Sequence, residues 1–286
     1  MRNKKRNSLF NLNFLRFPRI KKNKRGIFSI NFDKRQKFVI ATIVLSLGLF
    51  LTEFQFSKSG FSIVFLLAIF TNFFLWWATH DDLKVNKTYQ IFILPFFFNL
   101  AFGLFYFLTP TIILSRAILT VAYALGLYSL FLSQNILLVS STKTIALLSG
   151  ARIVSFVITL ISYFFLTNIV YSLRVNIFFV MIFAFIYTYF LVYSSLWTYN
   201  LQKTIQNVPT WVLALTVCLV EAVTILWFWP SSPTVLALFL AGFFYITVGL
   251  SHVWFEKRLF TGILWEYIWV GCIIFFVLIL FTPWGK

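Results

Sequence analysis

The residues with the clearest potential for chemistry form one short run, His80-Asp81-Asp82, which follows a long apolar segment. Two carboxylates beside an imidazole could hold a divalent cation against a lipid-linked diphosphate, as a membrane glycosyl- or prenyltransferase requires. The simpler interpretation is a solvated loop in which an Asp caps a helix, because loops are polar and Asp is a preferred cap residue. The catalytic interpretation of these three residues is therefore the alternative hypothesis.

Two further ionisable residues, Arg116 and Glu221, lie inside long apolar runs. A charged side chain in the bilayer costs about 2.5–3.5 kcal/mol on insertion scales, so such residues are usually paired or face a polar interior. At about 1.5 Å per helical residue the two lie at similar depths, and Glu53 lies at that level too. We expect an intramembrane ion pair of Arg116 and Glu221, which Glu53 could join. The pair is either a packing device between helices or a gate in a polar cavity.

The composition identifies lipid as the solvent of most of the chain. Of 286 residues, 60% are apolar, 21% aromatic and 11% charged, and the mean hydropathy is +0.90. A water-soluble domain carries about 25% charged residues, and one with 39 Phe would expose large apolar patches, so this class is excluded. Cys218 and Cys272 lie in apolar runs, where a thiol acts as a small hydrophobe, so we expect neither a metal site nor a disulfide.

Nine apolar runs are long enough to cross about 30 Å of hydrocarbon, for which a helix needs about 20 residues. Because the runs are unbroken and lack polar–apolar alternation, they predict helices and not the strands of a barrel. We expect Pro95 to kink the third run, and residues 133–143 could form a separate re-entrant piece, so eight or ten spans are alternatives. The fold class is an all-α, polytopic transmembrane bundle of residues 38–286 after a basic tail, 1–37. The runs cover residues 38–56, 61–79, 89–108, 111–132, 146–168, 175–197, 209–229, 233–251 and 263–282.

Basic residues are concentrated in the tail, which holds thirteen of the 24 Lys and Arg. The positive-inside rule therefore places the N-terminus on the cytoplasmic side of a bacterial-type plasma (inner) membrane. The tail has no small-x-small cleavage site, so we expect the first span to be retained. Because the tail is tethered beside a bilayer, we expect it to bind anionic lipid headgroups and not nucleic acid. The cytoplasmic side then also receives Lys84, Lys87, Lys143, Lys203, Lys257 and Arg258, and the other side Lys58, Arg174 and Lys286.

Lys143 and Arg152 flank the start of the fifth predicted span, and both side chains are long enough to reach lipid phosphates. We expect both to contact lipid headgroups, whereas His252 stands alone and is not predicted to be a ligand. The stretch 135–160 around them resembles a segment typical of an uncharacterised multi-pass bacterial membrane family, which implies a membrane fold and no particular activity. The resemblance is carried by Asn135-Ile136, Val139, Lys143-Thr144-Ile145, Leu147-Leu148, Ala151, Val154, Phe156 and Thr159-Leu160.

The chain lacks the motifs of familiar enzymes: a Gly-rich phosphate loop, HExxH, GxSxG, or cysteines at metal spacing. We therefore expect no cofactor and exclude a self-contained ATP-driven pump. The leading prediction is a small-solute or lipid transporter or a subunit of a membrane complex. The alternative is a membrane enzyme acting on a lipid-linked substrate at the cytoplasmic face. A cavity reaching Glu221 would favour transport, a lateral groove beside Asp81 and Asp82 would favour the enzyme, and a solid interior would favour a structural subunit.

Overall fold

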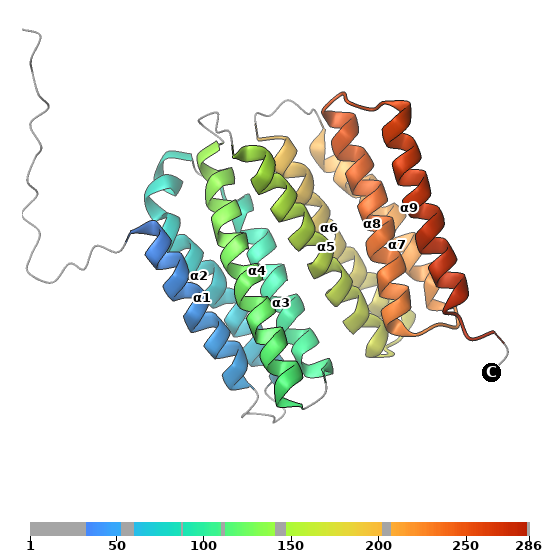
Figure 1. Ribbon diagram of the computed structural model, residues 1–286, viewed down its shortest axis with the longest axis horizontal. Coiled ribbons are helices and arrows are strands. Elements are labelled where there is room, and N and C mark those ends of the chain that lie inside the picture. Colours follow the sequence, from blue (N-terminus) through green and yellow to red (C-terminus); the bar gives the residue numbers. More distant parts are fainter. Residues whose placement is uncertain are drawn as a thin grey trace, which may run out of the picture. The chain divides into compact units, whose positions relative to one another are not determined.

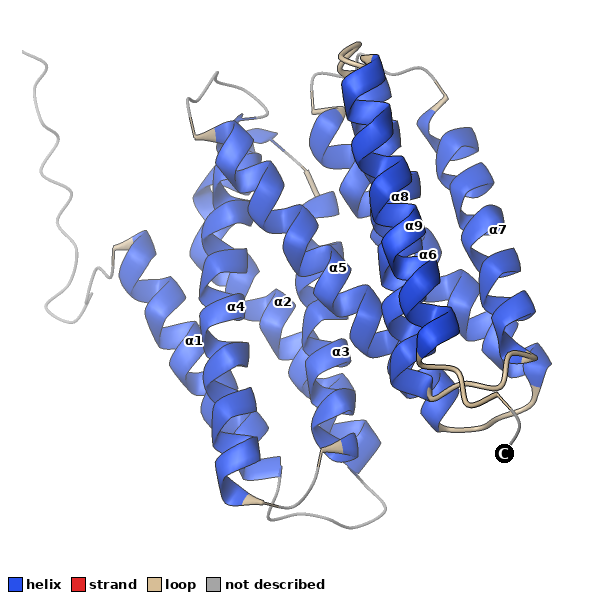
Figure 2. Cartoon of the chain, turned by 45° about the vertical axis from the view of Figure 1, so that its right-hand side comes forward, coloured by secondary structure: helices blue, strands red, loops and turns tan. Residues whose placement is uncertain are grey.

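The structure, a computed structural model, describes residues 33–52, 60–86, 88–109, 112–140, 147–201 and 207–284 (Figure 1). Within these ranges the chain forms nine α-helices and no strand (Figure 2), so the predicted all-α bundle is confirmed. One turn of 3-10 helix, η2 (Gln90–Phe92), precedes the third α-helix. The α-helices are α1 (Lys34–Leu51), α2 (Gly60–Asn86), α3 (Ile93–Leu108), α4 (Ile113–Ser140), α5 (Leu148–Ser172), α6 (Ile177–Tyr199), α7 (Val208–Trp227), α8 (Pro233–Phe255) and α9 (Thr261–Leu280).

The described helices α2 to α9 are each long and apolar enough to cross a membrane, which makes this a multi-pass membrane protein. The described part of α1 differs because its first turn carries Lys34, Arg35 and Lys37 and the helix has only 18 residues. The first predicted span, 38–56, continues into residues 53–56, which lie outside the described part of the chain.

Two helices run further than predicted. α4 continues to Ser140, so the part of the expected re-entrant piece that is described, 133–140, is the last two turns of one helix. α2 continues to Asn86, so the run that starts at His80 lies on a helix and not in a loop. Neither extension contains Gly or Pro, and Lys84 in the last turn of α2 interacts favourably with the helix dipole.

Pro95 lies in the first turn of a helix and does not kink one. α3 starts at Ile93, so Pro95 is its third residue, and the preceding turn is the separate helix η2. The first four N–H groups of an α-helix have no partner within the helix, so a residue without an N–H is tolerated there. The predicted kink inside a longer span is therefore wrong.

Helix α5 is the centre of the bundle and packs against α3, α4, α6 and α8. α1 packs on α2 and α4, while α7 packs on α6 and α8, and α9 packs on α8 at the edge (Figure 1). In the 18-residue apolar stretch of each span, 56% of the residues are buried for the span that contains α3 and for α5, but only 6% for α9. The first four helices and the last four are thus joined through α5 and through the contact of α3 with α6.

The first four helices are held together by close packing and by one buried amide. Gly103 lets α3 approach α2 closely, because a Cβ there would lie 2.5 Å from Val64 Cγ1. Asn99 Nδ2 donates to the Tyr123 hydroxyl (3.0 Å), to the Leu67 carbonyl (3.2 Å) and to the Thr71 hydroxyl. These bonds connect α2, α3 and α4 in a medium that offers few other partners to polar groups.

Candidate functional site

One end of the bundle, where α1 and α5 begin and α2, α6 and α8 end, is here called the basic end (Figure 1). Charged side chains of several described helices meet there. At this end Lys34 of α1 pairs with Asp82 of α2, with 2.7 Å between Nζ and Oδ2. Arg152 of α5 contacts the ends of α6 and α8. The candidate catalytic run and the predicted headgroup contact therefore lie at the same end of the bundle.

The run His80-Asp81-Asp82 does not converge on one point. Asp82 accepts both of its bonds from Lys34 Nζ, at 2.9 and 2.7 Å. His80 instead packs its ring edge-to-face against Trp76, with 4.8 Å between ring centroids. Successive residues on a helix point about 100° apart and do not face each other. Accordingly, no group of three or more His, Cys, Asp or Glu in the described residues is arranged to hold a metal ion.

Arg116 and Glu221 are not brought together. Arg116 lies near the start of α4 with 2% of its surface exposed, and its guanidinium carbon is 5.5 Å from the Tyr106 ring centroid. Glu221 lies on an exposed face of α7, which packs against α6 and α8. No ion pair between described residues includes Glu221. Arg116 belongs to α4 and Glu221 to α7, and Glu53 lies outside the described residues.

Arg152 connects the ends of three helices. Its Nε donates to the Thr198 carbonyl at 3.1 Å, and its Nη1 lies 3.5 Å from Glu256 Oε1. The guanidinium carbon is 4.8 Å from the Tyr199 ring centroid. Carbonyls in the last turn of a helix lack partners within the helix, so Arg152 satisfies one of those of α6. The predicted second headgroup contact, Lys143, lies outside the described residues.

Arg152 and its partners Thr198, Tyr199 and Glu256 are here called the Arg152 cluster. His252 lies next to this cluster and is 4% exposed. Its ring stacks on Tyr199 with 4.0 Å between centroids, and its Nε2 shares a hydrogen bond with Ser195 Oγ at 3.1 Å. The sequence suggested that His252 stands alone, but in the structure its ring contacts Tyr199 and Ser195. Two pairs of these residues are four positions apart, a spacing that places each pair on one helix face. They are Ser195 and Tyr199 on α6, and His252 and Glu256 at the end of α8.

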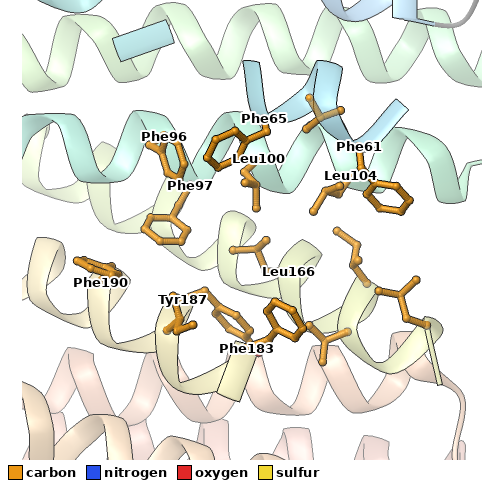
Figure 3. A pocket seen from close by; sticks show the side chains of 15 residues that line it. Phe61, Phe65, Phe96, Phe97, Leu100, Leu104, Leu166, Phe183, Tyr187 and Phe190 are labelled. Atoms are coloured by element: carbon orange, nitrogen blue, oxygen red, sulfur yellow. The ribbon is translucent and has the colours of Figure 1, made fainter. Parts of the chain in front are cut away.

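A groove of about 560 Å³ lies among α2, α3, α5 and α6 (Figure 3). Its floor is made of buried side chains such as Val64, Leu166 and Ile169, and its rim includes exposed Phe61 and Phe183. Every lining side chain but one is a hydrocarbon. The exception is Tyr187, whose hydroxyl hydrogen-bonds to Thr167 Oγ1 at 3.1 Å. The labelled rings and leucines in Figure 3 line both walls and are Phe61, Phe65, Phe96, Phe97, Leu100, Leu104, Leu166, Phe183, Tyr187 and Phe190.

The groove lies toward the end opposite the basic end, where α2 begins and α5 finishes. Its lining includes neither Glu221 nor Asp81 and Asp82, the residues beside which a cavity or groove was expected. Sequence reasoning missed it, because its lining comes from four helices and consists of residue types that occur throughout the chain. An apolar, aromatic-lined groove of this kind can hold a hydrocarbon chain.

Comparisons with known proteins identify a family for the chain but no activity. No curated protein and no solved structure matches the chain. The profile of the family described as "Protein of unknown function (DUF5656)" matches residues 39–281, which include the groove and the Arg152 cluster. The stretch 135–160 with its resemblance to an uncharacterised family also lies within this match. Because the match covers most of the chain, the protein belongs to the DUF5656 family.

Proposed function

We propose that this protein binds a membrane lipid and works as a lipid transporter, with an acyl chain of the lipid held in the groove. The observation that carries the proposal is the groove itself, about 560 Å³ in volume and lined almost wholly by hydrocarbon. Ligand sites in proteins have volumes of about 300–1,000 Å³. A small polar solute would need hydrogen-bonding groups that this lining does not offer, so the groove favours a lipid over a small solute.

The dimensions of the groove favour an acyl chain over a transmembrane helix of another protein. The lining residues on α5 run from Leu166 to Leu173 and those on α6 from Phe183 to Phe190. Seven residues extend about 10 Å along a helix, whereas a spanning helix is about 30 Å long and 10–12 Å wide. A flexible hydrocarbon chain enters such a short site, and lipid is the material that surrounds the rim in a membrane.

The orientation of the protein in the membrane is part of the proposal. Following the positive-inside rule, we place the basic end on the cytoplasmic side of a bacterial-type plasma membrane. Support comes from the described residues, because Lys34, Lys37 and Lys84 lie at the basic end and Arg174 at the other. The groove then lies in the outer half of the bilayer. The basic tail, of which residues 1–32 lie outside the described residues, would bind anionic headgroups of the inner leaflet.

The membrane-enzyme alternative receives less support from the geometry. A cavity of about 240 Å³ does lie beside His80 and Asp81, but its lining includes only one carboxylate. Asp82 is engaged by Lys34, and the large groove is far along the helix from Asp81. No ion pair between described residues supports a transporter centred on Arg116 and Glu221. The lipid hypothesis rests on different residues, which a direct experiment can test.

The test uses the full chain in nanodiscs that contain a phospholipid with a photoreactive diazirine at the middle of one acyl chain. Two variants fill the groove from separate walls, Leu104→Trp and Ile186→Trp, because both side chains line it and neither is fully buried. The matched control is Leu125→Trp, on an exposed face of α4 outside the groove. Each protein is irradiated and digested, and the cross-linked peptides are quantified by mass spectrometry.

We expect the wild-type protein to cross-link preferentially at peptides of the groove lining. Each groove variant should lose this preference by about tenfold, which corresponds to about 1.4 kcal/mol of binding, and the control should keep it. Cross-links spread evenly over all lipid-facing helices, or a preference that survives both Trp variants, would overturn the proposal.

A further inference from the structure

A second cavity, of about 240 Å³, lies near the basic end on the face shared by α1 and α2, and is here called the α1–α2 pocket. It is lined by Lys37 of α1 and by Trp76, Trp77, His80 and Asp81 of α2. The lining thus combines one cation, one carboxylate and three rings. This composition differs from that of the groove.

The two charges of this pocket form no ion pair with each other. The neighbouring charges Lys34 and Asp82 pair with each other at 2.7 Å. Lys37 and Asp81 belong to none of the ion pairs between described residues, although both line the same cavity. Lys37 Nζ lies instead 5.1 Å from the centroid of the Trp77 ring. A cation and a carboxylate that face one cavity without pairing are complementary to a ligand that carries both an anionic and a cationic group.

The pocket lies where the apolar surface of α2 ends. Phe73, whose ring centroid is 6.1 Å from that of Trp76, and Ile69 are exposed on the turns below it, and Lys84 follows one turn above. Trp residues in such a position mark the interface between hydrocarbon and headgroups. A molecule held in the pocket by its polar part would therefore lay its apolar part over Ile69 and Phe73.

We propose that the α1–α2 pocket binds the headgroup of a zwitterionic phospholipid with a primary ammonium, such as phosphatidylethanolamine. Lys37 binds the phosphate and Asp81 accepts hydrogen bonds from the ammonium, while the acyl chains run down α2 over Phe73. A primary ammonium donates charge-assisted hydrogen bonds to a carboxylate, which the quaternary ammonium of choline cannot do. This inference goes beyond the groove, because it concerns the other end of the helices and a different part of a lipid.

The test uses the full chain in nanodiscs of phosphatidylglycerol that contain a small fraction of phosphatidylethanolamine with a diazirine near its glycerol. Cross-linking to the α2 peptide around Trp76 is measured for the wild type, Lys37→Gln and Asp81→Asn. Matched controls are Lys34→Gln and Asp82→Asn, which change the same charges on the same helices outside the pocket. Unlabelled phosphatidylethanolamine, phosphatidylcholine, phosphatidylglycerol and soluble phosphoethanolamine serve as competitors.

We expect both pocket variants to lower this cross-link about tenfold and both controls to leave it within about twofold. Unlabelled phosphatidylethanolamine should compete well, and the other three competitors poorly. Equal competition by phosphatidylglycerol or by phosphatidylcholine would overturn the assignment of a primary ammonium, and strong competition by phosphoethanolamine would overturn the assignment of a lipid. Leu104→Trp in the groove should not change this cross-link, so each proposal can fail without the other.

Discussion

Replacing Gly103 by Ala should force helices α2 and α3 apart. A Cβ at this position would lie 2.5 Å from Val64 Cγ1 and 3.1 Å from Val64 Cγ2. Non-bonded carbon atoms are at their best separation at about 3.5–4.0 Å, so the two helices must separate by roughly 1 Å. Val64 cannot easily turn away, because it is 1% exposed and a β-branched side chain in a helix has one strongly preferred rotamer.

The expected loss of stability follows from this overlap. Overpacking a tight contact costs about 1–3 kcal/mol, while Ala in place of Gly gains up to about 1 kcal/mol in helix propensity. From the middle of the first range, the net loss is about 1 kcal/mol, which should lower the midpoint of thermal unfolding by about 2–4 °C. The assay is tryptophan fluorescence of the purified protein on heating in detergent. Gly150→Ala is the control, because a Cβ there meets nothing within 4 Å, and it should unfold at the wild-type temperature or slightly above.

A second substitution tests the cause of the effect. Val64→Ala removes the two methyl groups that the new Cβ would meet, so the double variant should be more stable than the sum of the single changes predicts. We expect a coupling energy of about 1–3 kcal/mol, as for residues in direct contact. If Gly103→Ala unfolds at the wild-type temperature, or if the two effects simply add, the reasoning from close helix packing is refuted.

Three further predictions concern other contacts. Arg152→Gln removes the charged donor at the ends of α6 and α8 and should destabilise the protein by about 1–2 kcal/mol, whereas Arg258→Gln, with a side chain 72% exposed, should have almost no effect on the unfolding midpoint. Asn99→Leu removes the bonds between α2, α3 and α4 and should cost about 1 kcal/mol, measured in the same assay; an unchanged midpoint would show that this network adds no stability. Cys218 and Cys272 lie exposed on spanning helices, so a charged maleimide should label neither in intact membrane vesicles and both after denaturation, and labelling in intact vesicles would contradict their burial in lipid.

The number and type of helices could be predicted from the sequence, because a bilayer requires long apolar runs and leaves few alternatives to a helix. The ends of α2 and α4 could not, because they depend on contacts between helices. In the last turns of α2, Asp82 contacts Lys34 of α1. The last turns of α4 contain Gln134, which donates to Ser155 of α5 at 3.4 Å. Hydropathy does not report either contact.

The sites were harder to predict for a related reason. The position of a residue in an apolar run predicts its depth in a span but not its neighbours across the bundle. Arg116 and Glu221 were expected at one level, yet no ion pair between described residues joins them. The Arg152 cluster left a signal, namely polar residues four apart near the ends of α6 and α8, which a search for short-spaced pairs would have found. The groove left none, because Phe and Leu that line it are indistinguishable in sequence from those that face lipid.

The peripheral position of α9 has a consequence for how the protein is made. Spanning helices enter the membrane in the order in which the ribosome delivers them, and α9 is the last of the described helices in the chain. Its span is 6% buried and it packs on α8, so the contacts among the eight earlier helices do not depend on its arrival. Assembly of the groove and of the Arg152 cluster can therefore be complete before α9 packs on α8.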